Sequence, residues 1–355
     1  MNKELLGLLA CPKCGHDLNL QIIKGEEKNI ISGFLQCRGC SEKYFIEDNI
    51  PIFCPEVQHG GVKAQKNNYS IWWDSYHDEN SITNETSRNY FYNSLVIRAE
   101  EMKGKIILDA GCGNGRFSFI VSHYKPKLLV SFDISSGLLQ AKKTISKYNP
   151  NANVVYVQGD ITNLPFKKGI FDVVFSWGVL HHTPNTRKSF SGISKLVREE
   201  GLLGIYVYEF HPLYHYDNQF LSFIAYLRQF ILIRPLRFIC SRLPAKLVHL
   251  FFQPIYYLER FFNFGLVGCH DAGTDKWNKK YYFRVVIDRF RTRYASEQQL
   301  EEVIGWFRDE GYNNLKVGRY PKISISGKKN TLNKSLWLNI AIPNQDLIDE
   351  SITNK

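Results

Sequence analysis

The chain has 355 residues, of which 44% are apolar, so it is long enough for one large domain with an attachment, or for two domains, and can bury a core. Its formal net charge of +11 favours an anionic partner such as nucleic acid, a phosphorylated small molecule or an acidic membrane surface, although a merely basic surface is an equal alternative. No uninterrupted run of about 18 apolar residues occurs, which argues against a transmembrane helix.

The first residues, MNKELLGLLAC, have some features of a lipoprotein signal, since small and apolar residues precede Cys11. The apolar run is only LLGLLA, however, and Glu4 lies just before it, whereas the apolar part of a secretory signal spans roughly 7 to 15 residues after a basic segment. We therefore expect a cytoplasmic protein.

Two CxxC motifs follow within residues 1–56: Cys11 and Cys14 in CPKC, and Cys37 and Cys40 in CRGC. Each motif presents two thiolates from one tight turn, and two such turns together make a tetrahedral zinc site. Two disulfides or a redox pair are weaker alternatives, because no export signal is expected and a redox pair needs only one CxxC. Four cysteines leave no position for a catalytic water, so the zinc is predicted to be structural and to stabilise this small domain.

The segment from LLGLLACPKCGHDL to the exit Ile50-Pro51-Ile52 resembles the small zinc-ribbon family whose members bind and activate methyltransferases. In that family the ribbon is often a separate subunit, whereas here it is fused to a longer chain. Residues 57–84 then read as a linker or lid. Gly60-Gly61 favours a linker, and the aromatic residues after it either pack in a core or cover a ligand pocket: Tyr69, Trp72, Trp73 and Tyr76.

The stretch ILDAGCGNGRF is typical of a buried parallel strand, a glycine turn and a helix, in which glycine lets a ligand approach the backbone near the amides of the helix N-terminus. Gly111, Gly113 and Gly115 follow a Gly-x-Gly-x-Gly spacing, which differs from the dinucleotide fingerprint Gly-x-Gly-x-x-Gly. Asp109 precedes the first glycine. An acid there favours a ligand with a cationic ammonium group over a pyrophosphate.

Two further predicted strands also end in acids. Asp133 ends LLVSFD, about 24 residues after Asp109, where a carboxylate can accept the hydroxyls of a ribose. Asp160 follows VVYVQG, where its side chain and the neighbouring backbone can bond an adenine amine. Ammonium, ribose and adenine recognition in this order indicate S-adenosylmethionine.

The motifs DAGCGNG, FDIS, GDITNLPF and FDVVFSWGVLHHTPN resemble those of the class I S-adenosylmethionine-dependent methyltransferases, over roughly residues 85–210 and again 285–330. The resemblance implies an α/β fold, a doubly wound, seven-stranded, Rossmann-like sheet over residues 85–330, with a zinc ribbon before it and a helical insertion after the fifth strand. It also implies a set of cofactor contacts: Asp109, Gly111, Gly113, Asp133, Ile134, Asp160, Ile161, Trp177 and Gly178.

The strand FDVVFSWGVLHHTPN ends where this family places its reacting centre. It lacks the [DN]PP[YFW] pattern of exocyclic-amine methyltransferases and the nucleophilic cysteine that C5-cytosine methylation requires. It offers His181 and His182, and imidazole has the pKa best suited to removing a proton near neutral pH. Packing or edging of the cofactor is the alternative role. His215, in the cluster HPLYHYD, is the third catalytic candidate.

The insertion, residues 211–284, is aromatic and apolar, and Pro235, Pro244 and Pro254 are expected to divide it into short helices. Between residues 218 and 258 it holds five basic residues and no acid. A lid over an apolar or anionic substrate, a homodimer or partner surface, and a peripheral membrane contact all remain open. Ser296 is a candidate N-cap for the helix that follows, and residues 331–355 form a polar tail.

The expected function is methyl transfer from S-adenosylmethionine to a small molecule such as a sugar, lipid or biosynthetic intermediate, at oxygen more than at carbon or nitrogen. The main alternative is an rRNA or tRNA methyltransferase, because a zinc ribbon before this fold also resembles the rRNA guanine methyltransferases and the positive charge fits phosphate binding. A noncatalytic activating subunit is the third alternative. The intact set of strand-end acids argues against it.

Overall fold

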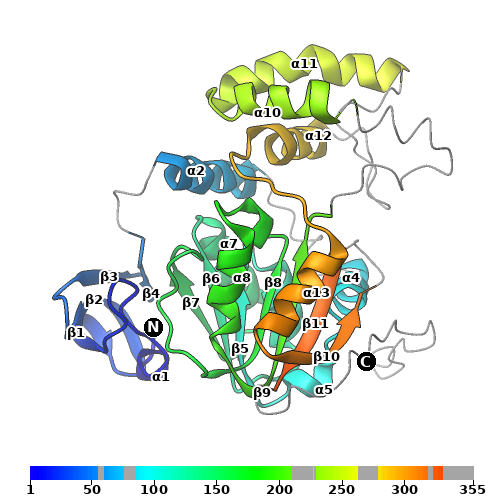
Figure 1. The fold of residues 1–355 in the computed structure, drawn as a ribbon. Coiled ribbons are helices and arrows are strands. Elements are labelled where there is room, and N and C mark those ends of the chain that lie inside the picture. Colours follow the sequence, from blue (N-terminus) through cyan, green and yellow to red (C-terminus); the bar gives the residue numbers. More distant parts are fainter. Residues whose placement is uncertain are drawn as a thin grey trace.

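The computed structural model describes residues 1–54, 60–75, 85–209, 227, 229–262, 279–318 and 323–330. The chain forms three parts: an N-terminal ribbon, a large sheet with helices on both faces, and a layer of helices (Figure 1). The ribbon lies beside the sheet, and the layer of helices lies beyond the carboxyl ends of its parallel strands. We call the last part the cap and define it as residues 229–262 and 279–291.

The ribbon is a short helix followed by an antiparallel sheet. Helix α1 (Lys3–Leu6) precedes β1 (Leu18–Glu26), β2 (Asn29–Cys37), β3 (Lys43–Glu47) and β4 (Ile50–Pro51), which pair in the order β1-β2-β3-β4. Burial alternates along β3, so one face of this sheet is turned inward and the other faces solvent.

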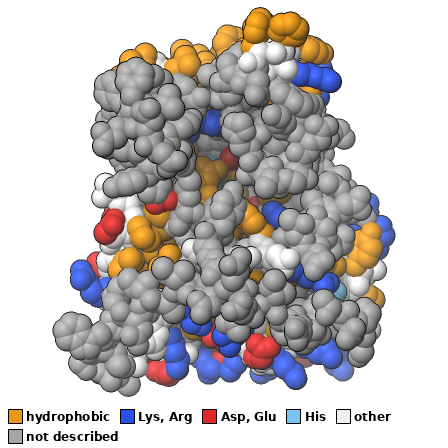
Figure 2. All heavy atoms as spheres, turned by 90° about the vertical axis from the view of Figure 1, so that its right-hand side faces the viewer, with side chains coloured by type: hydrophobic (Ala, Val, Ile, Leu, Met, Phe, Trp, Pro, Cys, Tyr) orange, Lys and Arg blue, Asp and Glu red, His pale blue; other side chains and the backbone are white. Residues whose placement is uncertain are grey.

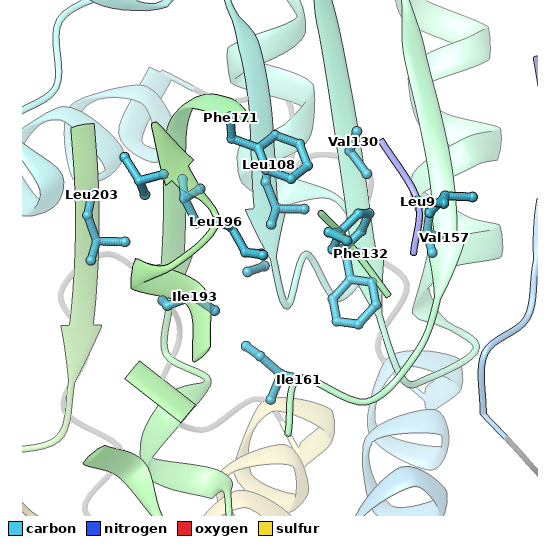
Figure 3. Packing of buried hydrophobic residues seen from close by; sticks show 14 of the residues in the cluster. Leu9, Leu108, Val130, Phe132, Val157, Ile161, Phe171, Ile193, Leu196 and Leu203 are labelled. Atoms are coloured by element: carbon cyan, nitrogen blue, oxygen red, sulfur yellow. The ribbon is translucent and has the colours of Figure 1, made fainter. Parts of the chain in front are cut away.

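The ribbon packs directly onto the large sheet. The Phe53 N–H donates to the Gln158 carbonyl at 2.7 Å, and the Ala10 N–H donates to the Pro165 carbonyl at 3.0 Å. Leu9 from the ribbon joins the same hydrophobic core as the large sheet (Figure 3). The two parts are thus joined by backbone hydrogen bonds and by shared apolar packing.

The large sheet has seven strands in the order β10-β11-β9-β8-β5-β6-β7. Their bounds are β5 (Ile106–Ala110), β6 (Leu128–Asp133), β7 (Val154–Gln158), β8 (Phe171–Trp177), β9 (Val197–Val207), β10 (Tyr312–Val317) and β11 (Ile323–Lys329). The pairs from β7 through β9 are parallel, whereas β11 is antiparallel to both of its neighbours. The predicted fold class is confirmed. The chain runs outward from β5 to β7 and then returns to β8 on the other side of β5, so the ligand crevice is expected at the carboxyl ends of these strands.

Helices cover both faces of the sheet because neighbouring strand residues point to opposite sides. Ile107 packs under α4 (Glu85–Leu95) and α6 (Arg116–Ser122), while Leu108 packs on the face covered by α8 (Thr186–Ser194) and α13 (Leu300–Asp309). Leu108, Val130 and Phe132 lie side by side in this second core (Figure 3). The remaining helices of this part are α5 (Ala99–Met102), α7 (Gly137–Tyr148) and the short η1 (Leu180–His182).

The cap has a small core of its own. It comprises η2 (Gln229–Ile233), α10 (Arg234–Cys240), α11 (Ala245–Phe262), α12 (Lys279–Val286) and η3 (Ile287–Arg291), and its buried side chains include Phe252, Tyr256 and Phe290. Helix α2 (Gly60–Ser75) contacts α7 on one side and α12 and η3 on the other, so it lies between the sheet and the cap (Figure 1). Among the described helices, none combines the length and apolar character that crossing a bilayer requires.

Two local expectations are wrong. Pro254 does not end a helix but lies inside α11, and Phe252 and Tyr256, two residues before and after it, bury their rings in the core of the cap. Ser296 is not an N-cap, because α13 begins at Leu300 and Ser296 instead bonds back to Thr186 and His181.

Candidate functional site

The glycine turn after β5 is closely covered by other elements. Gly111 and Gly113 have φ angles of 101° and 55°, which favour glycine over residues with a Cβ. A Cβ on Gly113 would lie 2.2 Å from the Trp73 ring, and one on Gly111 would lie 2.3 Å from Val179. The turn therefore needs glycine both for its backbone conformation and for the close approach of α2 through Trp73.

Asp109 and Asp133 end neighbouring strands and are buried. The Ser118 hydroxyl donates to Asp109 Oδ2 at 2.7 Å. Asp133 Oδ2 accepts the Gly113 N–H at 2.8 Å, and its Oδ1 accepts the N–H and hydroxyl of Ser135 at 2.8 and 2.6 Å. Asp133 thus holds the glycine turn against β6, and Asp109 is held by Ser118 in the first turn of α6.

The charge of these two acids is not balanced within the described residues, since no lysine or arginine of that set contacts either carboxylate. Burial raises the pKa of Asp109 to about 7, with the nearby Asp133 adding to the effect, and burial also raises the pKa of Asp133. A cationic ligand that also donates hydrogen bonds would relieve this cost. The two carboxylates therefore fit the positively charged sulfonium and ammonium groups and the ribose hydroxyls of S-adenosylmethionine.

The other predicted cofactor residues surround the same carboxyl edge. Asp160 follows β7 and accepts the Thr162 N–H at 2.9 Å, and Ile161 beside it is buried in the core. Ile134 directly follows Asp133. Trp177 ends β8, where its indole N–H donates to the Ser94 hydroxyl at 3.1 Å. Gly178 follows with a φ of 74° and the nearest side chain, Tyr206, 3.8 Å from its Cβ position.

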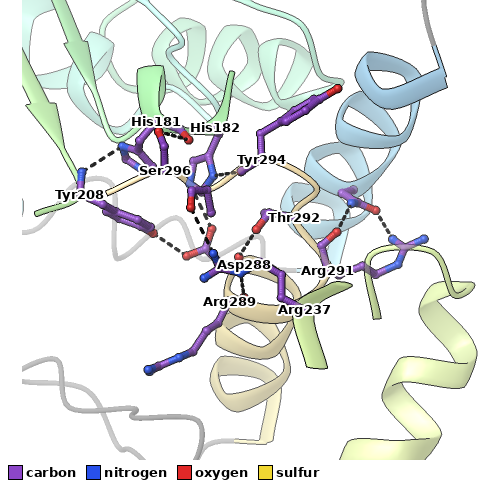
Figure 4. A network of polar contacts seen from close by, with 12 residues as sticks. His181, His182, Tyr208, Arg237, Asp288, Arg289, Arg291, Thr292, Tyr294 and Ser296 are labelled. Carbon is purple, nitrogen blue, oxygen red and sulfur yellow. Dashed lines mark hydrogen bonds and ion pairs between the residues drawn. The ribbon is translucent and has the colours of Figure 1, made fainter. Parts of the chain in front are cut away.

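His181 and His182 lie in a buried polar network between the sheet and the cap (Figure 4). His182 Nδ1 is 2.9 Å from the Tyr294 carbonyl, and its Nε2 is 3.6 Å from an Asp288 oxygen. The Tyr208 hydroxyl donates to the other Asp288 oxygen at 2.8 Å. Asp288, on η3 of the cap, thus joins a residue that follows β9 to one that follows β8.

The hydrogen bonds assign the protons on both imidazoles. Because a carbonyl can only accept, His182 donates from Nδ1, and in the neutral ring its Nε2, which faces Asp288, carries the lone pair. The Tyr208 N–H donates to His181 Nδ1 at 3.2 Å, so the His181 proton is on Nε2, which finds no acceptor among the described residues. Burial lowers the pKa of both histidines, and Asp288 opposes this for His182. A proton taken up by His182 would be stabilised by a carboxylate 3.6 Å away.

The four ribbon cysteines form a site that fits zinc. The sulfur atoms of Cys11, Cys14, Cys37 and Cys40 all lie within 4.8 Å of one another. The Cys14–Cys37 and Cys11–Cys40 sulfur pairs are 3.3 and 3.6 Å apart, close to the separation of about 3.8 Å that follows from tetrahedral Zn–S bonds of about 2.3 Å. The backbone N–H groups of Gly39 and Cys40 point at Cys37 Sγ, as expected for a thiolate ligand.

Sequence reasoning missed Ser118, Tyr208 and Asp288. Ser118 stands in the first turn of the helix after the glycines, a position from which it could have been inferred. Tyr208 and Asp288 are 80 residues apart, and no local pattern joins them. His215 and the rest of the cluster 211–217 lie outside the described residues.

Two known families match this chain. Residues 108–205 match the methyltransferase domain family, and residues 2–49 match the Trm112p-like protein family. The chain joins a Trm112p-like domain to a methyltransferase domain. This confirms the predicted methyltransferase class and the predicted ribbon family. The methyltransferase domain holds the glycine turn, the strand-end acids and both histidines described above.

Several similar proteins are tRNA-modifying enzymes by name, and another is the sterol 24-C-methyltransferase of Saccharomyces cerevisiae, at 24% identity over 178 residues that cover 48% of this chain and 46% of that protein. The chain is 26% identical over 168 residues to the tRNA U34 carboxymethyltransferase of Campylobacter lari, which covers 46% of this chain and 56% of that protein. It is 32% identical over 113 residues to the enzyme of the same name from Helicobacter pylori, covering 31% and 42%. The chain thus spans about half the length of the curated relatives it matches. A solved S-adenosylmethionine-dependent methyltransferase from Mesorhizobium loti is similar at 23% identity and a TM-score of 0.27, over 30% of this chain and 47% of that one.

These relatives correct the acceptor expected from the sequence. A small molecule was the expected primary substrate and partner, with RNA as the alternative. The matching proteins are named for a nucleoside of tRNA, and the ribbon belongs with the Trm112p-like proteins. The small-molecule prediction is therefore wrong.

Proposed function

We propose that this chain transfers a methyl group from S-adenosylmethionine to a nucleoside of tRNA in the cytoplasm. The observation that carries the proposal is the match of the methyltransferase domain to tRNA U34 carboxymethyltransferases. The Trm112p-like domain and the net charge of +11, which suits a polyanionic substrate, support it.

In this proposal the cofactor contacts are those expected from the sequence. Asp109 balances the positive charge of the cofactor, and Asp133 accepts a ribose hydroxyl while it holds the Gly113 amide. Asp160 and Ile161 border the adenine, and Trp177 and Gly178 border the sulfonium. S-adenosylmethionine supplies a methyl group on a leaving group already activated by positive charge. The chain therefore has mainly to hold the acceptor in line with that methyl group and exclude water, and Trp73 over the glycine turn contributes to the second task.

His182 is the proposed general base. Its Nδ1 is held by the Tyr294 carbonyl, its Nε2 is unprotonated, and Asp288 stabilises the proton it takes up. Tyr208 fixes Asp288 in place through its hydroxyl. His181 positions the backbone after β9 through the Tyr208 N–H and has no proposed proton-transfer step.

The test uses the zinc-loaded full chain, methyl-labelled S-adenosylmethionine and total tRNA from cells that lack this gene. Label should enter the tRNA fraction, and digestion to nucleosides followed by mass spectrometry should identify one methylated nucleoside. Asp133→Ala is the inactive control. Label confined to rRNA, protein or small metabolites, with none in tRNA, would overturn the proposal.

A further inference from the structure

The outer side of the cap exposes an unusual amount of apolar surface. Seventeen large apolar side chains are exposed among the described residues, and twelve of them lie between residues 227 and 262. Large contiguous apolar patches on a folded protein usually mark an interaction site. Figure 2 shows hydrophobic side chains, with basic ones beside them, gathered at the end of the molecule formed by the cap.

Helix α11 is apolar on two opposite sides. Val248, Phe252 and Tyr256 face the small core of the cap. The opposite side exposes residues that recur at helical spacing, with exposed fractions from 49 to 82%: Leu247, Leu250, Phe251, Tyr257, Leu258, Phe261 and Phe262. A helix that is apolar all round is normally buried on all sides. The outer side of α11 is therefore expected to be covered by something other than the described chain.

Basic residues border this outer apolar side. Lys246 and Arg260, which lie two heptads apart, share one flank of α11, and Arg242 is exposed just before the helix. The sole acid of α11, Glu259, is buried on the inner side. The surface thus combines aliphatic and aromatic side chains with positive charge that no acid among the described residues pairs with.

We propose that the outer side of α10 and α11 binds the surface of an anionic lipid bilayer. An amphipathic helix with aromatic and aliphatic residues on one side and basic residues beside them lies in the plane of the interface, its apolar side chains among the acyl chains and its basic residues at the headgroups. The charges of α11 and its length of about 27 Å fit this position, parallel to the membrane. A second copy of the chain is a poorer occupant, because an antiparallel two-fold contact through α11 would bring two basic flanks together. This proposal does not depend on tRNA as the methyl acceptor.

The experiment measures partition of the zinc-loaded full chain onto vesicles of equal parts phosphatidylglycerol and phosphatidylcholine, with pure phosphatidylcholine vesicles as the comparison. The triple variant Phe238→Ser, Leu250→Ser, Phe261→Ser should lower the partition coefficient at least about tenfold. These side chains are 61, 65 and 82% exposed, so the fold should survive, which circular dichroism checks. The matched control, Ile23→Ser with Phe45→Ser, alters equally exposed apolar residues of the ribbon and should bind vesicles like the wild type.

A second variant tests the role of charge. Arg242→Gln, Lys246→Gln and Arg260→Gln together should lower binding to anionic vesicles by about fivefold for each residue at low salt, and should leave binding to phosphatidylcholine unchanged. The proposal is overturned if the wild type does not bind anionic vesicles, or if the ribbon control loses binding as strongly as the cap variant. It is also overturned if the apolar triple variant abolishes a dimer seen by light scattering, or abolishes tRNA binding, while vesicle binding is unchanged.

Discussion

Replacing Asp109 by asparagine should make the cofactor-free protein more stable while abolishing its affinity for S-adenosylmethionine. Asp109 is 2% exposed, and burial raises its pKa to about 7, whereas an aspartate in an unfolded chain titrates near 3.9. A raised pKa means that the protonated carboxyl favours the folded state below about pH 4 and that this contribution is lost as the pH rises through about 7. The difference between the two pKa values corresponds to about 4 kcal/mol.

Asparagine removes this cost but introduces another. Its amide oxygen can still accept the Ser118 hydroxyl, whereas its NH₂ group becomes a buried donor that costs about 1 to 3 kcal/mol. The variant should therefore unfold with a free energy about 1 to 3 kcal/mol larger than the wild type at about pH 8. Between about pH 8 and pH 5.5 this advantage should shrink by about 2 kcal/mol. At the lower pH the buried carboxyl of the folded wild type is protonated, so it carries less of the cost of a buried charge.

The assay is urea unfolding of the zinc-loaded, cofactor-free protein across this pH range, with calorimetry to measure cofactor binding. Ser176→Ala is the matched control, because it removes a buried hydroxyl that donates to the Ala110 carbonyl on the neighbouring strand but does not titrate. Its effect should not vary with pH. Two results would refute the assignment of Asp109 as a buried acid that binds a cation. One is a difference in the free energy of unfolding between Asp109→Asn and the wild type that does not vary with pH, and the other is normal cofactor binding by the variant.

Three further changes test other parts of the site. Gly113→Ala should reduce cofactor affinity at least about tenfold, since its φ of 55° and the Trp73 ring leave no room for a Cβ, and calorimetry that shows normal binding would contradict this. Cys14→Ser should lower the zinc content measured by atomic absorption and the melting temperature of the ribbon, whereas Cys240→Ser, far from the cluster, should leave the zinc content unchanged. His182→Gln should lower kcat by about 10² to 10⁴ with cofactor affinity intact. Because burial lowers the pKa of His182 below its usual value near 6.5, wild-type activity should fall only below that pH, and this acid limb should be missing from the variant.

The parts of the site that the sequence predicts well are those in which one short segment decides both the fold and the position of a side chain. An apolar run ending in an acid places Asp109, Asp133 and Asp160 at adjacent strand ends, because parallel strands share one carboxyl edge. Two CxxC turns likewise bring four thiolates together. In each case the physical cause lies within a few residues, so it is visible in the sequence.

The remaining contacts depend on tertiary packing and could not be read locally. The approach of Trp73 to the glycine turn requires that residues 60–75 form a helix, although Gly60-Gly61 favoured a linker. The link from His182 to Asp288 crosses the whole insertion. Ser296 was wrongly predicted as an N-cap, because its actual partners, Thr186 and His181, lie in distant segments that no local pattern indicates. The acceptor was also predicted wrongly, because the motifs in the sequence indicate the cofactor and do not identify the acceptor.

The hydrogen bond from the Phe53 N–H to the Gln158 carbonyl brings the ribbon within two residues of Asp160, a proposed cofactor contact. The ribbon and the methyltransferase domain are parts of one polypeptide here, so they are made in equal number, and dilution cannot separate them. Loss of zinc would then act within each molecule, because unfolding of the ribbon would remove its hydrogen bond to the end of β7, two residues before Asp160. It would not shift an equilibrium between free subunits.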